Sequence, residues 1–412
     1  MAIKKLSTEM INRIAAGEVI ERPAAVVKEL MENAIDAAAT VIEVYVEGGG
    51  KNSIVVADNG AGIAEAELPL AVYRHATSKL TDDNILDLPY LGFRGEALSA
   101  MGAVSNLTLV SKTKEQADFF SLSLVGGKVG QVKKDKGFAL GAWSATPMLA
   151  IETADKGDKS YLASNVVGVQ GWDNLLSGRL LSGTRVVVRD LFYQTPARLK
   201  FLGSERVELT RIATVIEKMA LSHPSLAISY WQDGKEKYRF PPGQDLRQRL
   251  AVLWGPAVAD ELLPLSNRAA GWRGINHGAP PVDGSPPNPD RDQLEKGVND
   301  LWLEGLCSLP TAWRNNRGGL YFFVNGRAVE DKNFYAVVRA AYQDVLGQGA
   351  HGRYPLVVLN LHCPRRMVDV NVHPTKAEVR FQFPQDINGL IIKRIREALQ
   401  THGQQTARQG DR

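Results

Sequence analysis

Hydrophobic positions in the first quarter of the chain follow helical and strand periods in turn. Residues 23–38 carry apolar side chains three and four positions apart, and Pro23 suits a first turn, so we expect a helix there. Residues 40–47 alternate and are β-branched, and residues 53–58 form a short apolar run, so both segments predict strands. A glycine-rich turn follows at once, and another helix is expected from about Glu65.

The same alternation continues to the end of the chain. Strands are predicted at residues 104–111, 184–190, 320–324 and 355–361, and helices at residues 204–221, 245–253, 333–346 and 385–400. Residues 230–242 predict a hairpin at a domain junction. Residues 277–293 are too rich in proline for regular structure, which predicts a mobile loop. Strands alternating with helices favour α/β or α+β layers.

Composition narrows the class of protein. A chain of 412 residues suggests two or three domains, and 44% hydrophobic with 23% charged residues excludes wholesale disorder. No long apolar run or secretory signal is found, so we expect a cytoplasmic protein that does not enter a membrane. The two cysteines and seven histidines lack metal-ligand spacing, and the net charge of +4 permits an anionic partner without requiring one.

Two groups of polar residues are candidates for chemistry. Glu29 and Asn33 lie one helical turn apart, which suits a general base beside a Mg²⁺ ligand, although a solvated helix face has the same pattern. Asp58 ends a strand before Gly60 and Gly62, so its carboxylate can accept a hydrogen bond from an amine while the glycines admit a flat ligand. An ordinary Asp-Asn-Gly turn is the alternative interpretation.

Several further segments suit phosphate. Residues 92–98 form a glycine-flanked loop that opens a helix, where unpaired N–H groups bind phosphate oxygens. The residues of this loop are Gly92, Phe93, Arg94, Gly95, Glu96, Ala97 and Leu98. Thr77, Ser78 and Lys79 offer hydroxyls and an ammonium group, and Lys376 follows a strand and a proline turn. The absence of a Walker A sequence excludes a P-loop NTPase.

Taken in order, these motifs resemble the four signatures of the GHKL ATPases, whose members include gyrase B, a heat-shock chaperone family, histidine kinases and MutL. The fourth signature is Gly183-Thr184. Six longer blocks resemble the MutL mismatch-repair family and occur in that family's order. These blocks lie at residues 14–23, 74–79, 92–98, 190–198, 323–327 and 369–376.

The resemblance implies an α+β architecture in two domains. A GHKL (Bergerat-type) α/β sandwich is expected at residues 1–228, and a second βαβ domain of the ribosomal-protein-like type at residues 229–400, followed by a polar tail or linker. Residues 126–182 and 278–310 are longer than the family's pattern, and the second stretch is expected to be a mobile insertion. Ala38 stands where the family usually has glycine, and it costs roughly 1 kcal/mol if the position needs a positive φ.

The resemblance also implies ATP and Mg²⁺ as ligands. Glu29 is expected to be the general base and Asn33 to hold the metal. Asp58, Gly60, Gly62 and Thr184 are expected to form the adenine site. Thr77, Ser78 and Lys79, together with the loop at residues 92–98, are expected to cover the phosphates, and Lys376 to reach the γ-phosphate from the second domain.

Partners follow from the same family. We expect ATP-dependent homodimerisation with exchange of residues 1–20, and binding of DNA without sequence preference. The candidate DNA contacts are Arg314, Arg317, Arg327 and Lys332. Other expected partners are a MutS-type mismatch-recognition protein and a downstream nuclease or helicase, with the protein acting at the bacterial nucleoid. We expect an ATPase fragment without nuclease activity. The alternatives are a nucleotide-gated interaction scaffold whose hydrolysis is irrelevant, and another GHKL ATPase such as a topoisomerase subunit.

Overall fold

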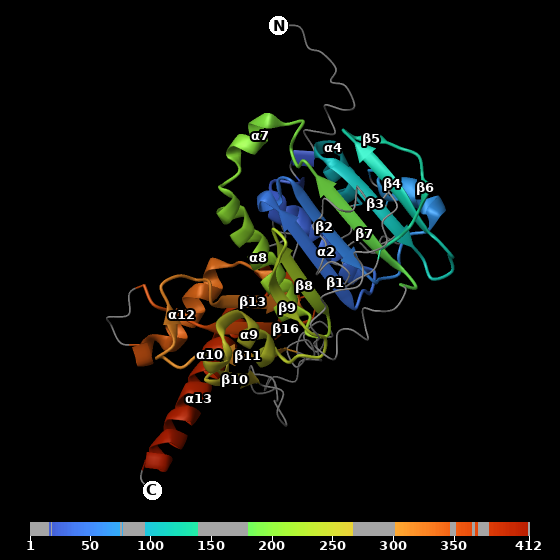
Figure 1. Ribbon diagram of the computed structural model, residues 1–412. Coiled ribbons are helices and arrows are strands. Elements are labelled where there is room, and N and C mark those ends of the chain that lie inside the picture. Colours follow the sequence, from blue (N-terminus) through green and yellow to red (C-terminus); the bar gives the residue numbers. More distant parts are fainter. Residues whose placement is uncertain are drawn as a thin grey trace, which may run out of the picture. The chain divides into compact units, whose positions relative to one another are not determined.

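The computed structural model consists of two compact units (Figure 1). One unit contains residues 1–220 and 224–244, and the other contains residues 221–223 and 245–412. The structure describes residues 16–17, 19–74, 76, 95–138, 180–266, 301–346, 352–364, 367–369 and 379–410. None of the helices within these ranges is long and apolar enough to cross a membrane.

In the described part of the first unit, nine strands form one mixed sheet with the order β5-β4-β3-β7-β2-β1-β8-β9, and β6 pairs with β4. The strands are β1 (Val41–Glu47), β2 (Ser53–Asp58), β3 (Asn106–Lys112), β4 (Phe119–Val125), β5 (Lys128–Val129), β6 (Lys133–Asp135), β7 (Gly183–Arg189), β8 (Ala227–Gln232) and β9 (Lys235–Phe240). Neighbouring strands are antiparallel except for β1 and β8, which are parallel.

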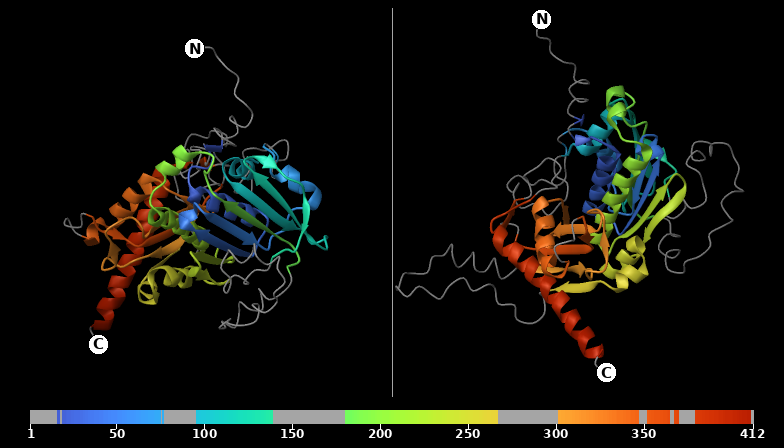
Figure 2. Two further views of the ribbon diagram at one scale, coloured as in Figure 1. Left: turned by 45° about the horizontal axis from the view of Figure 1, so that its top comes forward. Right: turned by 90° about the vertical axis from the view of Figure 1, so that its left-hand side faces the viewer.

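Helices cover one side of this sheet, as Figure 2 shows for α2 and α8. The helical segments are α2 (Pro23–Asp36), η1 (Gly48–Gly50), η2 (Glu65–Glu67), α3 (Leu68–Ala71), α4 (Ala97–Val104), α7 (Pro196–Phe201) and α8 (Glu205–Ser222). The apolar stripe of α2, including Val26, Val27, Leu30 and Met31, is buried, as its spacing predicted. The result is the two-layer α/β sandwich expected of a GHKL ATPase.

The hairpin of β8 and β9 belongs to the first unit. Strand β8 pairs in parallel with β1, and β9 pairs with β8, so both strands extend the large sheet. The division between the units therefore follows Gln244 instead of falling between residues 228 and 229, where the sequence suggested it. The polar Asp233-Gly234 turn resembles a linker in sequence, but ladder pairing holds it within the sheet.

The second unit is built on a five-stranded sheet with the order β10-β11-β16-β13-β14 among its described residues. Its elements are α9 (Leu246–Trp254), α10 (Pro256–Asp260), β10 (Leu263–Ser266), β11 (Trp302–Cys307), β12 (Trp313–Arg314), β13 (Leu320–Val324), β14 (Arg327–Val329), α12 (Lys332–Leu346), β15 (Tyr354–Pro355), β16 (Val357–His362), β17 (Val368–Asp369), β18 (Arg380–Phe381) and α13 (Pro384–Gly410). Strands β13 and β16 are parallel, and α12 lies between them in the chain, which is the predicted βαβ connection.

Alternate residues of this sheet enter two cores. Val357 and Leu359 pack in a cluster with residues of α12 and α13, whereas Val358 packs in a second cluster with residues of α9 and α10. This period of two is typical of a strand that is buried on both faces.

One predicted irregular stretch is partly wrong. Residues 302–307, assigned to the insertion at 278–310, form β11, which pairs with both β10 and β16 inside the sheet. Glu304 and Gly305 interrupt the apolar pattern of that strand and conceal it in the sequence. The polar tail expected from residue 401 is helical, since α13 continues to Gly410. Residues 139–179 and 267–300 lie outside the described residues.

Candidate nucleotide site

Three polar side chains form a row across the ends of three strands in the first unit. Asp58 on β2 is the register partner of Thr184 on β7, and Thr184 is the register partner of Ser111 on β3. Directly opposed residues of antiparallel strands project to the same face, so the three side chains are neighbours. The hydroxyl oxygens of Ser111 and Thr184 are 2.8 Å apart.

The Asp58 carboxyl is a buried acceptor. Only 6% of the residue is exposed, and its Oδ1 accepts a hydrogen bond of 2.8 Å from the Gly60 N–H. Burial raises the pKa of Asp58 to about 6, while N–H groups of Gly60 and Thr184 favour the charged form and limit the rise. At neutral pH the group is therefore a carboxylate that can accept a further hydrogen bond from a bound amine.

Two glycine positions in the turn after Asp58 have no room for a side chain. Gly62 has φ 76°, and a Cβ atom there would lie 2.0 Å from the Lys112 carbonyl oxygen at the end of β3. A Cβ atom on Gly60 would lie 2.8 Å from the Ala37 carbonyl oxygen at the end of α2. The predicted residues Asp58, Gly60, Gly62 and Thr184 are therefore brought together at one end of the sheet.

Helix α2 presents the other half of the candidate site. It carries Glu29 and Asn33 one turn apart, both half-buried, on a helix that packs against β2 and α4. The Ala61 N–H donates to the Ala37 carbonyl oxygen over 2.9 Å, so the end of α2 is tied to the turn that follows Asp58. The C-terminal end of α2 therefore fixes where Glu29 and Asn33 lie relative to Asp58 and its glycine turn.

Ala38 adopts the left-handed conformation that the glycine at this position would favour, with φ 57°. The Ala38 N–H donates to the Ile35 carbonyl oxygen, and the Ala39 N–H donates to the Ala34 carbonyl oxygen. These two hydrogen bonds form a Schellman motif at the end of α2. The departure from the family pattern therefore falls at a position that does require a positive φ.

The start of α4 supplies the described part of the loop predicted to contact phosphate. Ala97 and Leu98 are its first residues, and Glu96 is its N-cap. The Glu96 carboxylate pairs with Arg74 at 3.3 Å, and a Cβ atom on Gly95 would lie 2.4 Å from the Ala76 carbonyl oxygen. The chain segments on either side of residues 77–94 therefore lie next to each other.

The remaining predicted phosphate contacts stay predictions. Thr77, Ser78, Lys79, Gly92, Phe93, Arg94 and Lys376 lie outside the described residues.

Two protein families match parts of this chain. The family "Histidine kinase-, DNA gyrase B-, and HSP90-like ATPase" matches residues 21–157, and "DNA mismatch repair protein, C-terminal domain" matches residues 292–400. The DNA mismatch repair protein MutL of Allorhizobium ampelinum is 37% identical over 411 residues, which is 100% of this chain and 54% of that protein. The chain belongs to the MutL family.

Solved structures share the fold of this MutL-family chain. The N-terminal domain of a DNA repair protein superposes with a TM-score of 0.65 at 21% identity, covering 95% of this chain and 98% of that one. The Aquifex aeolicus MutL ATPase domain complexed with ADP gives a TM-score of 0.50 at 22% identity, covering 84% of this chain and 93% of that one. The chain spans about half the length of the curated MutL relatives it matches.

The basic candidates of the MutL-family chain lie in the second unit. Arg314 and Arg317 are exposed, and the Arg317 guanidinium lies 4.6 Å from the ring centroid of Tyr335. Tyr335 follows Lys332 by about one turn of α12. Arg327 is half-buried on β14. Stacking on aromatic rings fixes the position of the arginine charges.

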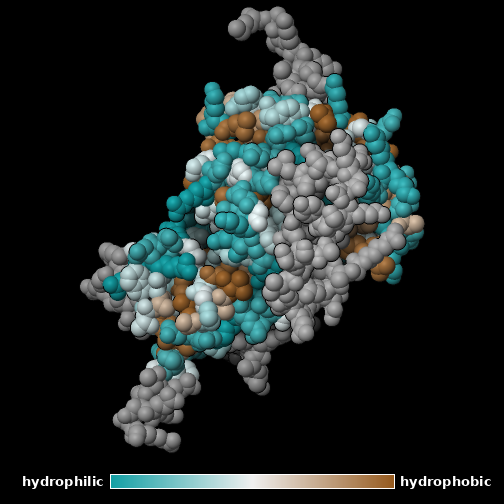
Figure 3. Space-filling view, viewed as in Figure 1, coloured by the Kyte–Doolittle hydropathy of each residue, from teal (hydrophilic) through white to brown (hydrophobic). Residues whose placement is uncertain are grey.

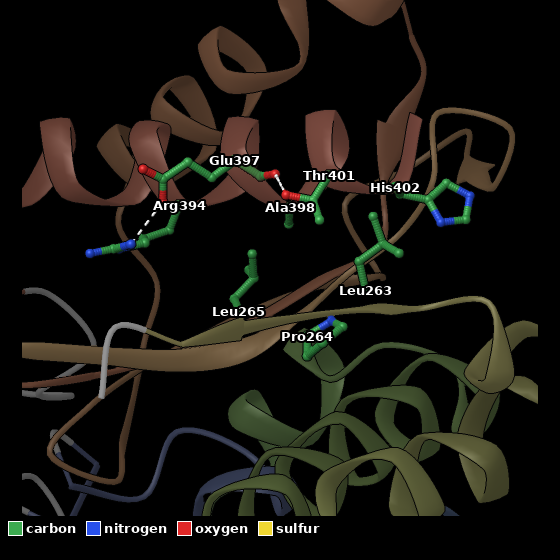
Figure 4. A pocket seen from close by; sticks show the side chains of 8 residues that line it. All are labelled: Leu263, Pro264, Leu265, Arg394, Glu397, Ala398, Thr401 and His402. Atoms are coloured by element: carbon green, nitrogen blue, oxygen red, sulfur yellow. Dashed lines mark hydrogen bonds and ion pairs between the residues drawn. The ribbon is translucent and has the colours of Figure 1, made fainter. Parts of the chain in front are cut away.

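A cavity of about 280 Å³ lies elsewhere in the second unit, between β10 and α13 (Figure 4). It is lined by Leu263, Pro264, Leu265, Arg394, Glu397, Ala398, Thr401 and His402. Arg394 is paired with Glu397 at 2.7 Å, so this charged group already has a partner within the lining. On the face that Figure 3 draws, the described residues are mainly hydrophilic and the hydrophobic ones form small patches, as is ordinary for a protein surface. Neither feature marks the MutL nucleotide site.

Sequence reasoning missed two residues that the structure brings to these sites. Ser111 joins Thr184 only because β3 and β7 pair across a long separation in sequence, and a serine at a strand end gives no signal of its own. The Arg353 guanidinium lies 4.5 Å from the ring centroid of Trp313, and Trp313 directly precedes Arg314 in the chain. Its position near Arg314 depends on the β12–β15 pairing.

Proposed function

We propose that this chain binds ATP and hydrolyses it slowly, as a molecular switch in DNA mismatch repair. The observation that carries the proposal is the row of Asp58, Thr184 and Ser111 beside a turn in which Gly60 and Gly62 have no room for side chains. A buried carboxylate beside a glycine-containing turn suits a base that carries an exocyclic amine. The Asp58 carboxylate accepts the adenine amine, Gly60 and Gly62 give the ring room, and Thr184 completes the base site.

Hydrolysis needs a group that takes a proton from the attacking water. Glu29 is that general base: it orients the water and accepts its proton as the oxygen attacks the γ-phosphorus. Asn33 offers an amide oxygen, the hard donor that Mg²⁺ prefers, one turn further along α2. The metal, when bound, neutralises charge on the phosphate oxygens.

Closing the phosphate end of the site requires segments from both units. Thr77, Ser78 and Lys79 form part of a cover over the phosphates, together with the backbone of residues 94–98. Lys376 reaches the γ-phosphate, so that ATP joins the second unit to the first. ATP binding then drives homodimerisation with exchange of residues 1–20, and hydrolysis reverses it.

DNA binding uses the second unit. Arg314, Arg317, Arg327 and Lys332 contact phosphates, which gives affinity without sequence preference. The stacking of Arg317 on Tyr335 supports this assignment because it holds a charge at the surface. In this role the protein links a MutS-type mismatch-recognition protein to a downstream nuclease or helicase, in the cytoplasm at the nucleoid.

A thermal shift with a non-hydrolysable ATP analogue and Mg²⁺ tests the nucleotide site. The parental chain is expected to gain stability with the analogue, and Asp58→Asn to gain none because it has lost the carboxylate acceptor. Asp118→Asn, which removes a surface ion pair with Lys134, is the matched control and should respond like the parent. A full shift in Asp58→Asn contradicts the assignment of the base site.

Size-exclusion chromatography with the same analogue tests the switch. A change from monomer to dimer on addition of analogue and Mg²⁺ supports ATP-driven dimerisation. Unchanged elution of a chain that nevertheless shows the thermal shift contradicts dimerisation and leaves the nucleotide site in place.

A further inference from the structure

We propose that Ser111 is a specificity-determining residue, which orients the hydroxyl of Thr184 so that the base site accepts adenine and rejects a 6-oxopurine. This inference rests on the proposed nucleotide-binding function. No sequence motif marks Ser111, and its role follows from the hydrogen-bond donors and acceptors around its buried hydroxyl.

Ser111 is fully buried and has three polar neighbours. Its Oγ lies 2.8 Å from the Ile63 backbone nitrogen, 3.0 Å from the Gly183 carbonyl oxygen and 2.8 Å from Thr184 Oγ1. A hydroxyl has one proton and two lone pairs, so three partners use its whole capacity.

The direction of each hydrogen bond follows from the chemistry of the partners. The Ile63 N–H can only donate, so Ser111 accepts there, and the Gly183 carbonyl can only accept, so Ser111 donates its single proton there. The contact with Thr184 is then a hydrogen bond only if Thr184 donates to the second lone pair of Ser111. Thr184 has thereby used its proton and presents only lone pairs to a ligand.

The base site therefore presents two acceptors at its amine-binding position. Asp58 is a carboxylate and Thr184 is an oriented acceptor, and the two are register partners on adjacent strands. The amino group at position 6 of adenine has two protons to donate. Guanine and hypoxanthine carry an oxygen at position 6, which would face two acceptors with no proton between them, and unpaired buried groups of this kind are strongly rejected.

Removing the Ser111 hydroxyl changes this selection in a specific way. In Ser111→Ala the Thr184 hydroxyl loses its acceptor and can rotate to donate its proton to a 6-oxo group. We expect the preference for ATP over inosine triphosphate to fall by about tenfold, while affinity for ATP changes only a few-fold. Asp58 remains, so the preference is reduced and not inverted.

The experiment measures the affinities of the full chain for non-hydrolysable analogues of ATP and inosine triphosphate, which differ at position 6 without the extra amine of guanine. Ser105→Ala is the matched control: Ser105 is also a fully buried serine of the first unit, and it donates to the Met101 carbonyl at 2.6 Å in α4. The control is expected to keep the parental preference.

An unchanged ratio of the two affinities in Ser111→Ala overturns the inference. If both analogues weaken in parallel, Ser111 has only a structural role, and if neither affinity changes, Ser111 does not orient Thr184. Should Ser111→Ala fail to fold, Thr184→Val removes the oriented acceptor directly, and an unchanged ratio in that variant has the same meaning. A parental chain that binds neither analogue refutes the proposed function itself, whereas one that binds both equally refutes only the role of Ser111.

Discussion

Replacing Ala38 by glycine should stabilise the first unit. Ala38 has φ 57° at the end of α2, a conformation that costs a residue with a Cβ atom about 1–2 kcal/mol. Glycine removes that strain but adds about 0.4–1 kcal/mol of backbone entropy to the unfolded chain. The side chain of Ala38 is exposed, so no burial is lost, and the net gain is about 0.5–1 kcal/mol.

The measurement is the free energy of unfolding in urea, together with the thermal midpoint, for the parent and Ala38→Gly. A gain of this size corresponds to about 2 °C for a unit of this length. Ala37→Gly is the control, because Ala37 has φ −81° and glycine there relieves no strain, so this variant should be less stable than the parent. If both substitutions lower stability equally, the strain assigned to Ala38 is refuted.

Three further results are expected. Affinity for ATP should fall as pH drops through about 6, because protonated Asp58 cannot accept the amine. Burial raises the pKa of Asp58 from its ordinary value of 3.8 to about 6, so its ionisation destabilises the fold by up to about 3 kcal/mol between pH 4 and pH 7. Unfolding of Asp58→Asn should lack this pH dependence. Arg317→Glu should weaken DNA binding and reduce the slope of the logarithm of the DNA-binding constant against the logarithm of salt concentration by about one. Lys393→Glu, at another exposed position of the second unit, should leave this slope unaltered. Gly62→Ala should lower the free energy of unfolding more than Gly234→Ala does, and it should abolish the thermal shift with the ATP analogue. Both glycines have φ 76°, but only an alanine at position 62 would place a methyl group 2.0 Å from a backbone atom. Equal losses of stability in the two variants would show that the clash is relieved.

Elements with a clear local pattern were predictable from the sequence. The helix from Pro23, the strand ending at Asp58 and the strand at residues 320–324 appear where their periods placed them. Each combines an unbroken apolar pattern with a distinct start or stop signal, so local information is sufficient.

Features that depend on tertiary pairing were not predictable. Strand β11 contains Glu304 and Gly305, and only its position between β10 and β16 explains it. The hairpin of β8 and β9 belongs to the first unit because of a parallel pairing with β1. Ser111 becomes part of the base site through the same kind of long-range register. The sequence motifs identified Asp58 and Thr184 as candidates, but only the pairing of β2, β7 and β3 shows that their side chains form a row with Ser111.

In the proposed reaction, Glu29 activates the water that attacks the γ-phosphate of an ATP molecule held at the row of Asp58, Thr184 and Ser111. The most direct measurement compares binding and single-turnover hydrolysis of ATP by the parent, Glu29→Ala and Glu67→Ala, the last being an exposed glutamate of η2. We expect Glu29→Ala to bind ATP like the parent and to hydrolyse it at least about 10²-fold more slowly, with Glu67→Ala unchanged. Hydrolysis by Glu29→Ala at the parental rate would contradict the account.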